Sequence, residues 1–184
     1  MGRLMRLREF VRASKVITNL GAWTDKGMPK TNSKFPLWKP KGVRLAAAWR
    51  WRVDEFTMDD GFGKSRVGRM LIAYRFDKEE YLAYVGLDEM SGHGVRVIGC
   101  LEFHGTHPGW HVHGSCAPQL KGHVGRTRHE GMRRVPGGKY YRQNVFITGD
   151  AQALSKAEEF FGFVGLTPPP PPPQIPPPQA SLQF

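Results

Sequence analysis

Hydrophobic and polar residues alternate through the middle of the chain, a pattern typical of half-buried β-strands. In the run 43–57, for example, Trp49, Trp51 and Val53 alternate with arginines. Similar runs follow, separated by turns rich in glycine, proline and aspartate. We expect these further strands over 67–76, 80–87, 95–104, 110–117 and 139–148.

Apolar residues recur at helical spacing on either side of this strand-rich region. The spacing predicts a basic amphipathic helix over 3–20 and a second helix over 150–163, with Asp150 as the N-cap of the second. The fold class that follows is α+β, with an antiparallel sheet of about five strands flanked by helices.

Changes in composition divide the chain into four parts. Residues 1–20 carry the basic helix, residues 21–42 form a basic loop, and residues 43–166 make up the α+β domain. Residues 167–184 form a proline-rich tail, which we expect to be disordered because proline lacks the amide hydrogen that helices and sheets need. Such a tail could also bind the aromatic-lined groove of a protein partner.

Charge is distributed unevenly along the 184 residues, whose formal net charge is +11. Residues 1–52 have a net charge of +11 and residues 117–149 of +6, whereas residues 53–116 have −4. Two basic blocks around an acidic middle favour a phosphate-binding surface, and therefore a nucleic-acid partner. The expected phosphate contacts in the second block are Lys121, Arg126, Arg128, Arg133, Arg134, Lys139 and Arg142.

Several classes of protein are excluded by composition. No apolar run reaches the length of about 18 residues that a membrane-spanning helix needs, so no membrane contact is expected. The N-terminal stretch lacks the apolar segment of a secretory signal. Two cysteines, Cys100 and Cys116, cannot build a disulfide framework. We therefore expect a soluble, cytoplasmic protein with reduced thiols.

Four of the seven histidines lie close together in a hairpin predicted over 95–117. Alternation places Glu102 and His104 on one face of its first strand, and His111 and His113 on one face of its second. Folding the hairpin brings these polar faces together. Two imidazoles and a carboxylate can hold a divalent cation and leave positions open for water and a phosphate oxygen.

We therefore predict a metal site made of Glu102, His111 and His113, with His104 as an alternative third ligand. Mg²⁺ and Mn²⁺ are the leading candidates, and Zn²⁺ also fits. A non-catalytic zinc site built from the four histidines, which include His107, would explain the same pattern.

The other hairpin positions are expected to face the core or border the site. Cys100 shares the Glu102 face and could be a further ligand. The predicted core positions are Val95, Val97, Leu101 and Phe103 on the first strand, and Trp110, Val112 and Cys116 on the second.

The motif Glu102-x8-His111-Val112-His113 resembles the second motif of the HUH endonucleases, in which a hydrophobic residue separates two histidines. This family includes rolling-circle replication initiators, relaxases and related transposases. The resemblance implies a ferredoxin-like, HUH-like fold with a central antiparallel sheet. It also implies single-stranded DNA as the substrate and a divalent cation that polarises the scissile phosphate.

The resemblance further implies a tyrosine nucleophile on a helix after the histidine strand. The helix predicted over 150–163 has no tyrosine, so the candidates are Tyr140 and Tyr141, beside Lys139 and Arg142. Both tyrosines could equally be ordinary strand aromatics. In that case a metal-dependent nuclease would use water as its nucleophile.

Three functions stay open at this point. The first is a metal-dependent enzyme that nicks and joins single-stranded DNA. The second is a non-catalytic nucleic-acid-binding protein, acting as a replication accessory or an inhibitor, with a structural or vestigial metal site. The third is an interaction protein that works through the proline-rich tail and the basic helix.

Overall fold

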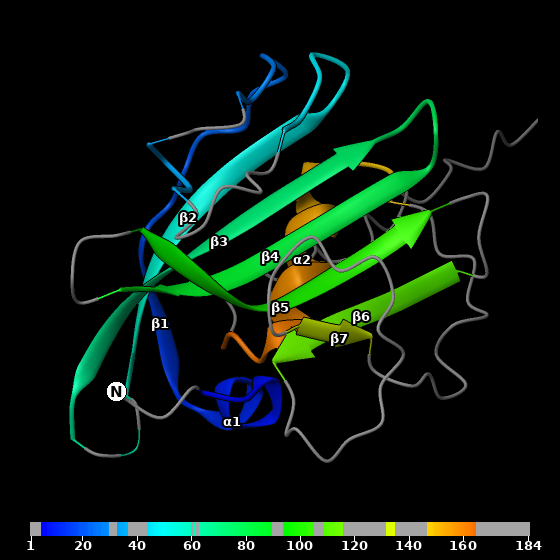
Figure 1. Ribbon diagram of the computed structural model, residues 1–184. Helices are drawn as coiled ribbons and strands as arrows, with labels where there is room; N and C mark the ends of the chain where they lie inside the picture. Colours follow the sequence, from blue (N-terminus) through cyan, green and yellow to red (C-terminus); the bar gives the residue numbers. More distant parts are fainter. Residues whose placement is uncertain are drawn as a thin grey trace, which may run out of the picture.

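An antiparallel sheet organises the part of the chain that the structure describes (Figure 1). The computed structural model describes residues 5–29, 33–36, 44–59, 61, 63–89, 94–104, 109–115, 132–134 and 147–164. In this part of the chain the strand order is β1-β2-β3-β4-β5-β6-β7. The strands are β1 Lys15–Asn19, β2 Arg50–Asp59, β3 Ser65–Arg75, β4 Glu80–Asp88, β5 Val95–His104, β6 Gly109–Ser115 and β7 Met132–Arg134, and the helices are α1 Leu7–Arg12 and α2 Asp150–Phe161.

Every strand pairs with its neighbour in the sequence, so the sheet is a meander. The predicted antiparallel sheet is confirmed, but the described fold is mostly β and not α+β, with seven strands and two short helices on one face of the sheet. The ferredoxin-like connectivity is wrong for the described strands, because it requires crossovers that place sequence-distant strands side by side. Here a turn of four residues, Phe76 to Glu79, is enough to join β3 to β4.

The first helix is much shorter than the predicted range of 3–20. It ends at Arg12, and Lys15–Asn19 form β1 instead. Two physical causes are visible. The run from Val16 to Thr18 is β-branched and favours a strand. The Lys15 amine donates hydrogen bonds to the carbonyl oxygens of Phe10 at 2.6 Å and Ala13 at 2.7 Å, which satisfies the end of the helix.

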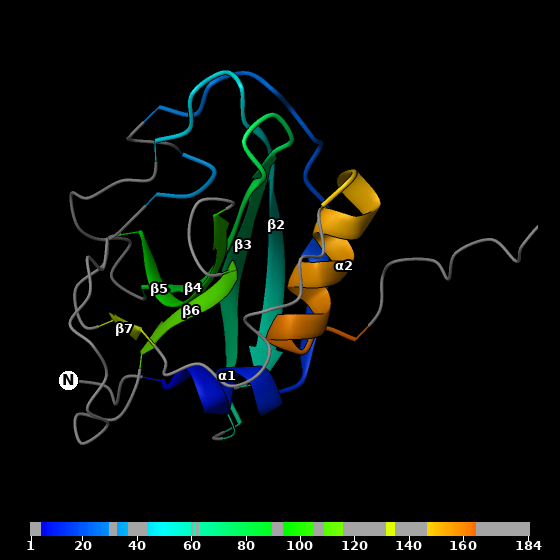
Figure 2. The same cartoon turned by 90° about the vertical axis from the view of Figure 1, so that its right-hand side faces the viewer.

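The sheet buries hydrophobic side chains on both faces. On one face α1 and α2 pack together (Figure 2). Phe10 of α1 and Phe161 of α2 meet there edge to face, with ring centroids 6.3 Å apart. On the other face Met28, Phe35 and Leu45 cover part of the sheet, and no helix of the described chain lies there. The two faces therefore differ in what covers them, and this decides which segments can reach the candidate site.

A pair of glycines lets α1 approach the sheet. Gly99 of β5 and Gly114 of β6 lie opposite each other in the register. A β-carbon at either position would come within 2.7 Å of a methyl group of Leu7 in α1. Glycine at both positions therefore makes room for the helix.

The N-terminal end of α2 is fixed to the sheet by a carboxylate. Its N-cap is Gly149, not Asp150 as predicted. The Asp150 carboxylate instead accepts two hydrogen bonds from the Arg50 guanidinium, both at 2.7 Å, and one from the Tyr74 hydroxyl at 2.8 Å. One turn later the Tyr81 hydroxyl donates to the Ala153 carbonyl at 3.0 Å. Side chains of β2, β3 and β4 thus hold the helix.

Several expectations fall outside the described residues. These are the tail over 167–184, Cys116 and nearly all of the strand predicted over 139–148. Met132–Arg134, which lie outside every strand that the sequence predicted, form β7. Neither α1 nor α2 has the length and apolar character to cross a membrane.

We expect Asp150→Asn to lower the free energy of unfolding by about 1 kcal/mol at neutral pH, because a bidentate charged hydrogen bond at a partly exposed site is lost. Glu159→Gln, on the same helix with a side chain 77 % exposed, is the matched control and should have little effect. Urea denaturation measures both.

The Asp150 contribution should depend on pH. Hydrogen bonding by Arg50 and then by Tyr74 lowers the pKa of Asp150 below its ordinary value of 3.8. The unfolded chain binds this proton more tightly, so the stabilisation is complete well above pH 3.8 and is lost as the pH falls below it. Equal acid sensitivity of the wild type and Asp150→Asn would contradict this account.

Candidate metal centre

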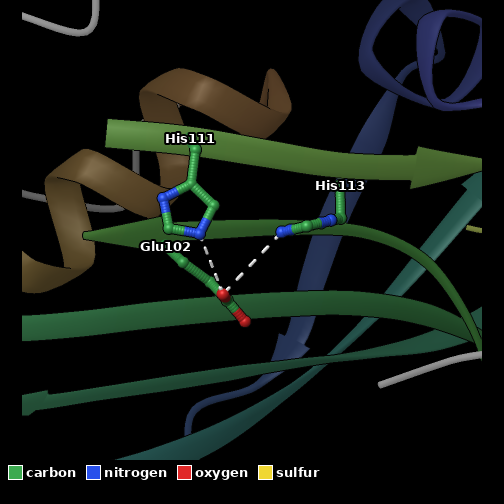
Figure 3. Close-up of side chains that lie close together, drawn as sticks. All are labelled: Glu102, His111 and His113. Carbon is green, nitrogen blue, oxygen red and sulfur yellow. Dashed lines mark hydrogen bonds and ion pairs between the residues drawn. The ribbon is translucent and has the colours of Figure 1, made fainter. Parts of the chain in front are cut away.

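The hairpin of β5 and β6 brings the predicted ligands together. Its register pairs Glu102 with His111 and Cys100 with His113. Paired residues of an antiparallel ladder share a face, so the carboxylate and both imidazoles lie on the same side of the sheet. Figure 3 shows the three side chains converging, with Glu102 reaching toward both histidines.

One carboxylate oxygen is the focus of this group. Glu102 Oε2 lies 3.1 Å from His111 Nε2, 3.5 Å from His104 Nε2 and 3.9 Å from His113 Nε2. The donor atoms of Glu102, His111 and His113 all lie within 4.8 Å of one another, and these residues form a group that could hold a metal ion. His104 borders the group without belonging to it, which favours Glu102 over His104 as the third ligand.

A β-bulge decides which side chains of β5 lie on the same face of the sheet as Glu102. Between β4 and β5 the register moves from Val85–Gly99 to Gly86–Val97, so Ile98 is an extra residue. Leu101 and Phe103, together with Trp110 and Val112, lie in the core as predicted, on the face that the helices cover. The prediction that Val95 and Val97 share that face is wrong, because the bulge turns both toward the face of Cys100 and Glu102.

Glu102 is ionised in this environment. Burial raises the pKa of its carboxyl, but hydrogen bonding with His104, His111, Cys100 and Tyr84 outweighs burial and brings the pKa well below its ordinary value. An anionic oxygen beside two imidazole nitrogens is a suitable donor set for a divalent cation.

Without a bound cation, a proton lies between the imidazole of His111 and the carboxylate of Glu102. A carboxylate can only accept hydrogen bonds, so His111 Nε2 carries the proton in its contact with Glu102 Oε2. The ring of His111 stacks on that of His104 with centroids 5.2 Å apart and meets the ring of His113 edge to face at the same distance. The group is recessed, since the side chains of Glu102, His111 and His113 are 12 %, 10 % and 14 % exposed.

The helix that follows the histidine strand lies on the wrong face to act at this site. Trp110 and Val112, between the ligands on β6, pack in the core with α2 residues Ala153 and Ala157. The imidazoles of His111 and His113 point to the opposite side. Any group that reaches the candidate metal centre must therefore come from a segment other than α2.

The remaining predicted site residues are only partly placed. Arg133 and Arg134 belong to β7, where Arg134 is the register partner of His113. His107, the fourth histidine of the alternative zinc site, lies outside the described residues. So do Tyr140, Tyr141, Lys121, Arg126, Arg128, Lys139 and Arg142.

The sequence did not reveal Tyr84 as part of the site. Its hydroxyl donates a 2.9 Å hydrogen bond to Glu102 Oε1. Alternation along 80–87 puts Tyr84 on a definite face of its strand. Which residues of β5 lie beside Tyr84 depends on the register of the two strands, and the bulge shifts that register by one residue.

Comparisons of the chain with protein-family models, with curated proteins and with solved structures give no match. The candidate metal centre therefore rests on the geometry of Glu102, His111 and His113.

We expect the protein to bind one divalent cation per chain, tested with Mn²⁺ and Zn²⁺ by isothermal titration calorimetry. His111→Ala and His113→Ala should each weaken binding by about tenfold or more, because each removes a ligand. His104→Ala is the control on the same face and should have a smaller effect. A loss for His104→Ala as large as that for His111→Ala would place His104 among the ligands.

Cation affinity should rise with pH from mildly acidic to neutral solution. Imidazole binds a metal only when its ligating nitrogen is unprotonated, so protons compete with the cation. Titrations at pH 5.5 and 7.5 in the same salt test this, and an affinity independent of pH would argue against histidine ligands.

Proposed function

We propose that this chain is a metal-dependent nuclease of the HUH type, which nicks and rejoins single-stranded DNA. The observation that carries the proposal is the convergence of Glu102, His111 and His113 on the sheet face away from both helices. The order of these residues along the chain, a glutamate followed by two histidines around a hydrophobic residue, supports the same type of enzyme.

The three side chains have separate tasks in this proposal. Glu102 provides the negative charge, and His111 and His113 provide neutral nitrogen donors. Val112 packs in the core and thereby keeps the two imidazoles on the outer face. A bound divalent cation supplies positive charge that polarises a phosphate oxygen of the DNA.

The nucleophile we propose is Tyr140 or Tyr141. The phenol gives up its proton as its oxygen bonds to phosphorus, while the bond from phosphorus to the 3′ oxygen breaks. The 3′ oxygen leaves as an oxyanion and takes up a proton, which gives a free 3′ hydroxyl and a tyrosine joined to the 5′ phosphate. Attack by that hydroxyl reverses the step and rejoins the strand. Tyr140 follows Arg134 by six residues, which span about 20 Å when extended. Since Arg134 is paired with His113, a segment of this length is long enough to reach the candidate centre, which supports the choice of Tyr140.

In this proposal, basic residues in and near β7 bind the phosphate groups of the DNA. Arg133 and Arg134 continue the sheet beside the histidine strand. Contacts of this kind position a strand without reading its sequence, so they set affinity and salt dependence. The cytoplasmic location and the protein partner for the tail stay predictions.

The second candidate is a nucleic-acid-binding protein without catalysis. It is favoured by one specific observation, the absence of tyrosine from α2 together with the packing of α2 against the opposite face. In this case the metal site stabilises the fold, and the basic residues bind the nucleic acid.

The two candidates differ in whether DNA becomes attached to the protein. We expect labelled single-stranded DNA incubated with the protein and Mn²⁺ to give a covalent band on a denaturing protein gel. A chelator, Glu102→Gln or the double change Tyr140→Phe/Tyr141→Phe should remove the band, and His104→Ala is the control on the same hairpin.

Other outcomes assign the function differently. Chelator-sensitive cleavage without a covalent band would replace the tyrosine by water as the nucleophile. Salt-dependent binding without cleavage, on several substrates, would refute the nuclease and support the second candidate.

A further inference from the structure

Both carboxylate oxygens of Glu102 have hydrogen-bonding partners. Oε1 accepts a hydrogen bond from the Tyr84 hydroxyl at 2.9 Å and another from the Cys100 thiol at 3.1 Å. These contacts lie on the side of the carboxylate away from Oε2, the oxygen that faces His111 and His113. Oε1 therefore bonds to side chains of the sheet, whereas Oε2 faces the position that a cation would take.

The pairing of β4 with β5 fixes the positions of the two donors. Tyr84 on β4 and Cys100 on β5 are direct register partners, so both project from the same face beside Glu102. Each is 1 % exposed. Buried donors to an anion keep their geometry, because no water can replace them when the carboxylate turns.

We propose that Tyr84 and Cys100 are positioning residues of the metal centre, which bind Oε1 so that Glu102 offers Oε2 alone to the cation. The inference rests on the proposed function, since it takes Glu102, His111 and His113 as the ligands. A carboxylate bound through one oxygen leaves one more coordination position open than a carboxylate bound through two. That position is available to a phosphate oxygen or to water.

Cys100 acts here as a donor and not as a ligand. Its sulfur contacts Oε1, and Cys100 is not part of the group whose donor atoms lie within 4.8 Å of one another. A thiol is a weaker donor than a phenol. The loss of Tyr84 should therefore cost more cation affinity than the loss of Cys100.

The experiment measures cation affinity in the full-length chain by calorimetry with Mn²⁺ and Zn²⁺, without DNA. Tyr84→Phe should weaken binding by about tenfold or more, the usual effect of losing a partner that orients a ligand. Cys100→Ala should weaken it by a smaller factor, and Cys100→Ser should restore it because a hydroxyl still donates.

Tyr81→Phe is the matched control. Tyr81 lies on the same strand, is also 1 % exposed and also loses a buried hydrogen bond, the one to the Ala153 carbonyl on the helix face. A general loss of stability would weaken cation binding in both tyrosine variants, whereas positioning predicts an effect for Tyr84→Phe alone. Equal affinities in the wild type and Tyr84→Phe would overturn the inference and leave the proposed metal site intact.

The Co²⁺ form gives a second readout that stability does not affect. The double change Tyr84→Phe/Cys100→Ala removes both donors to Oε1, so we expect a weaker visible absorption as the glutamate binds through both oxygens and the coordination number rises. The wild type should lack the near-ultraviolet band of a thiolate bound to cobalt. Such a band would make Cys100 a ligand and overturn its positioning role. A wild type that binds none of the three cations would overturn both this inference and the proposed function.

Discussion

The antiparallel register between β5 and β6 is the constraint on which the candidate site depends. It places Glu102 opposite His111 and Cys100 opposite His113. A slip of one residue would turn both histidines toward the helices and bring Trp110 and Val112 to the outer face. The apolar side chains therefore fix the position of the polar ones, because burying Trp110 and Val112 under α2 leaves the imidazoles no other face.

A carboxylate buried beside three imidazoles needs compensation for the loss of water. Glu102 obtains it from donors on both of its oxygens, which come from β4, β5 and β6. These interactions keep the carboxylate anionic and oriented at the same time. The same hydrogen bonds thus stabilise the buried carboxylate without a cation and orient it toward the position of one.

Local patterns in the sequence predicted what depends on local structure. Alternation along the hairpin was sufficient to place Glu102, His111 and His113 on one face. It failed for Val95 and Val97, because the bulge at Ile98 is set by pairing with β4. It also failed for the helix expected over 3–20, where β-strand pairing with β2 overrides helical spacing. Tyr84 could not be foreseen, since its contact depends on the register between two strands.

The proposed chemistry requires that Glu102, His111 and His113 hold a divalent cation. Anomalous X-ray diffraction from crystals grown with Zn²⁺ or Mn²⁺ can locate such an ion. We expect one strong peak about 2.0–2.2 Å from Nε2 of both histidines and from Oε2 of Glu102, with Oε1 still hydrogen-bonded to Tyr84. The absence of a peak between these three residues would show that they are not the ligands.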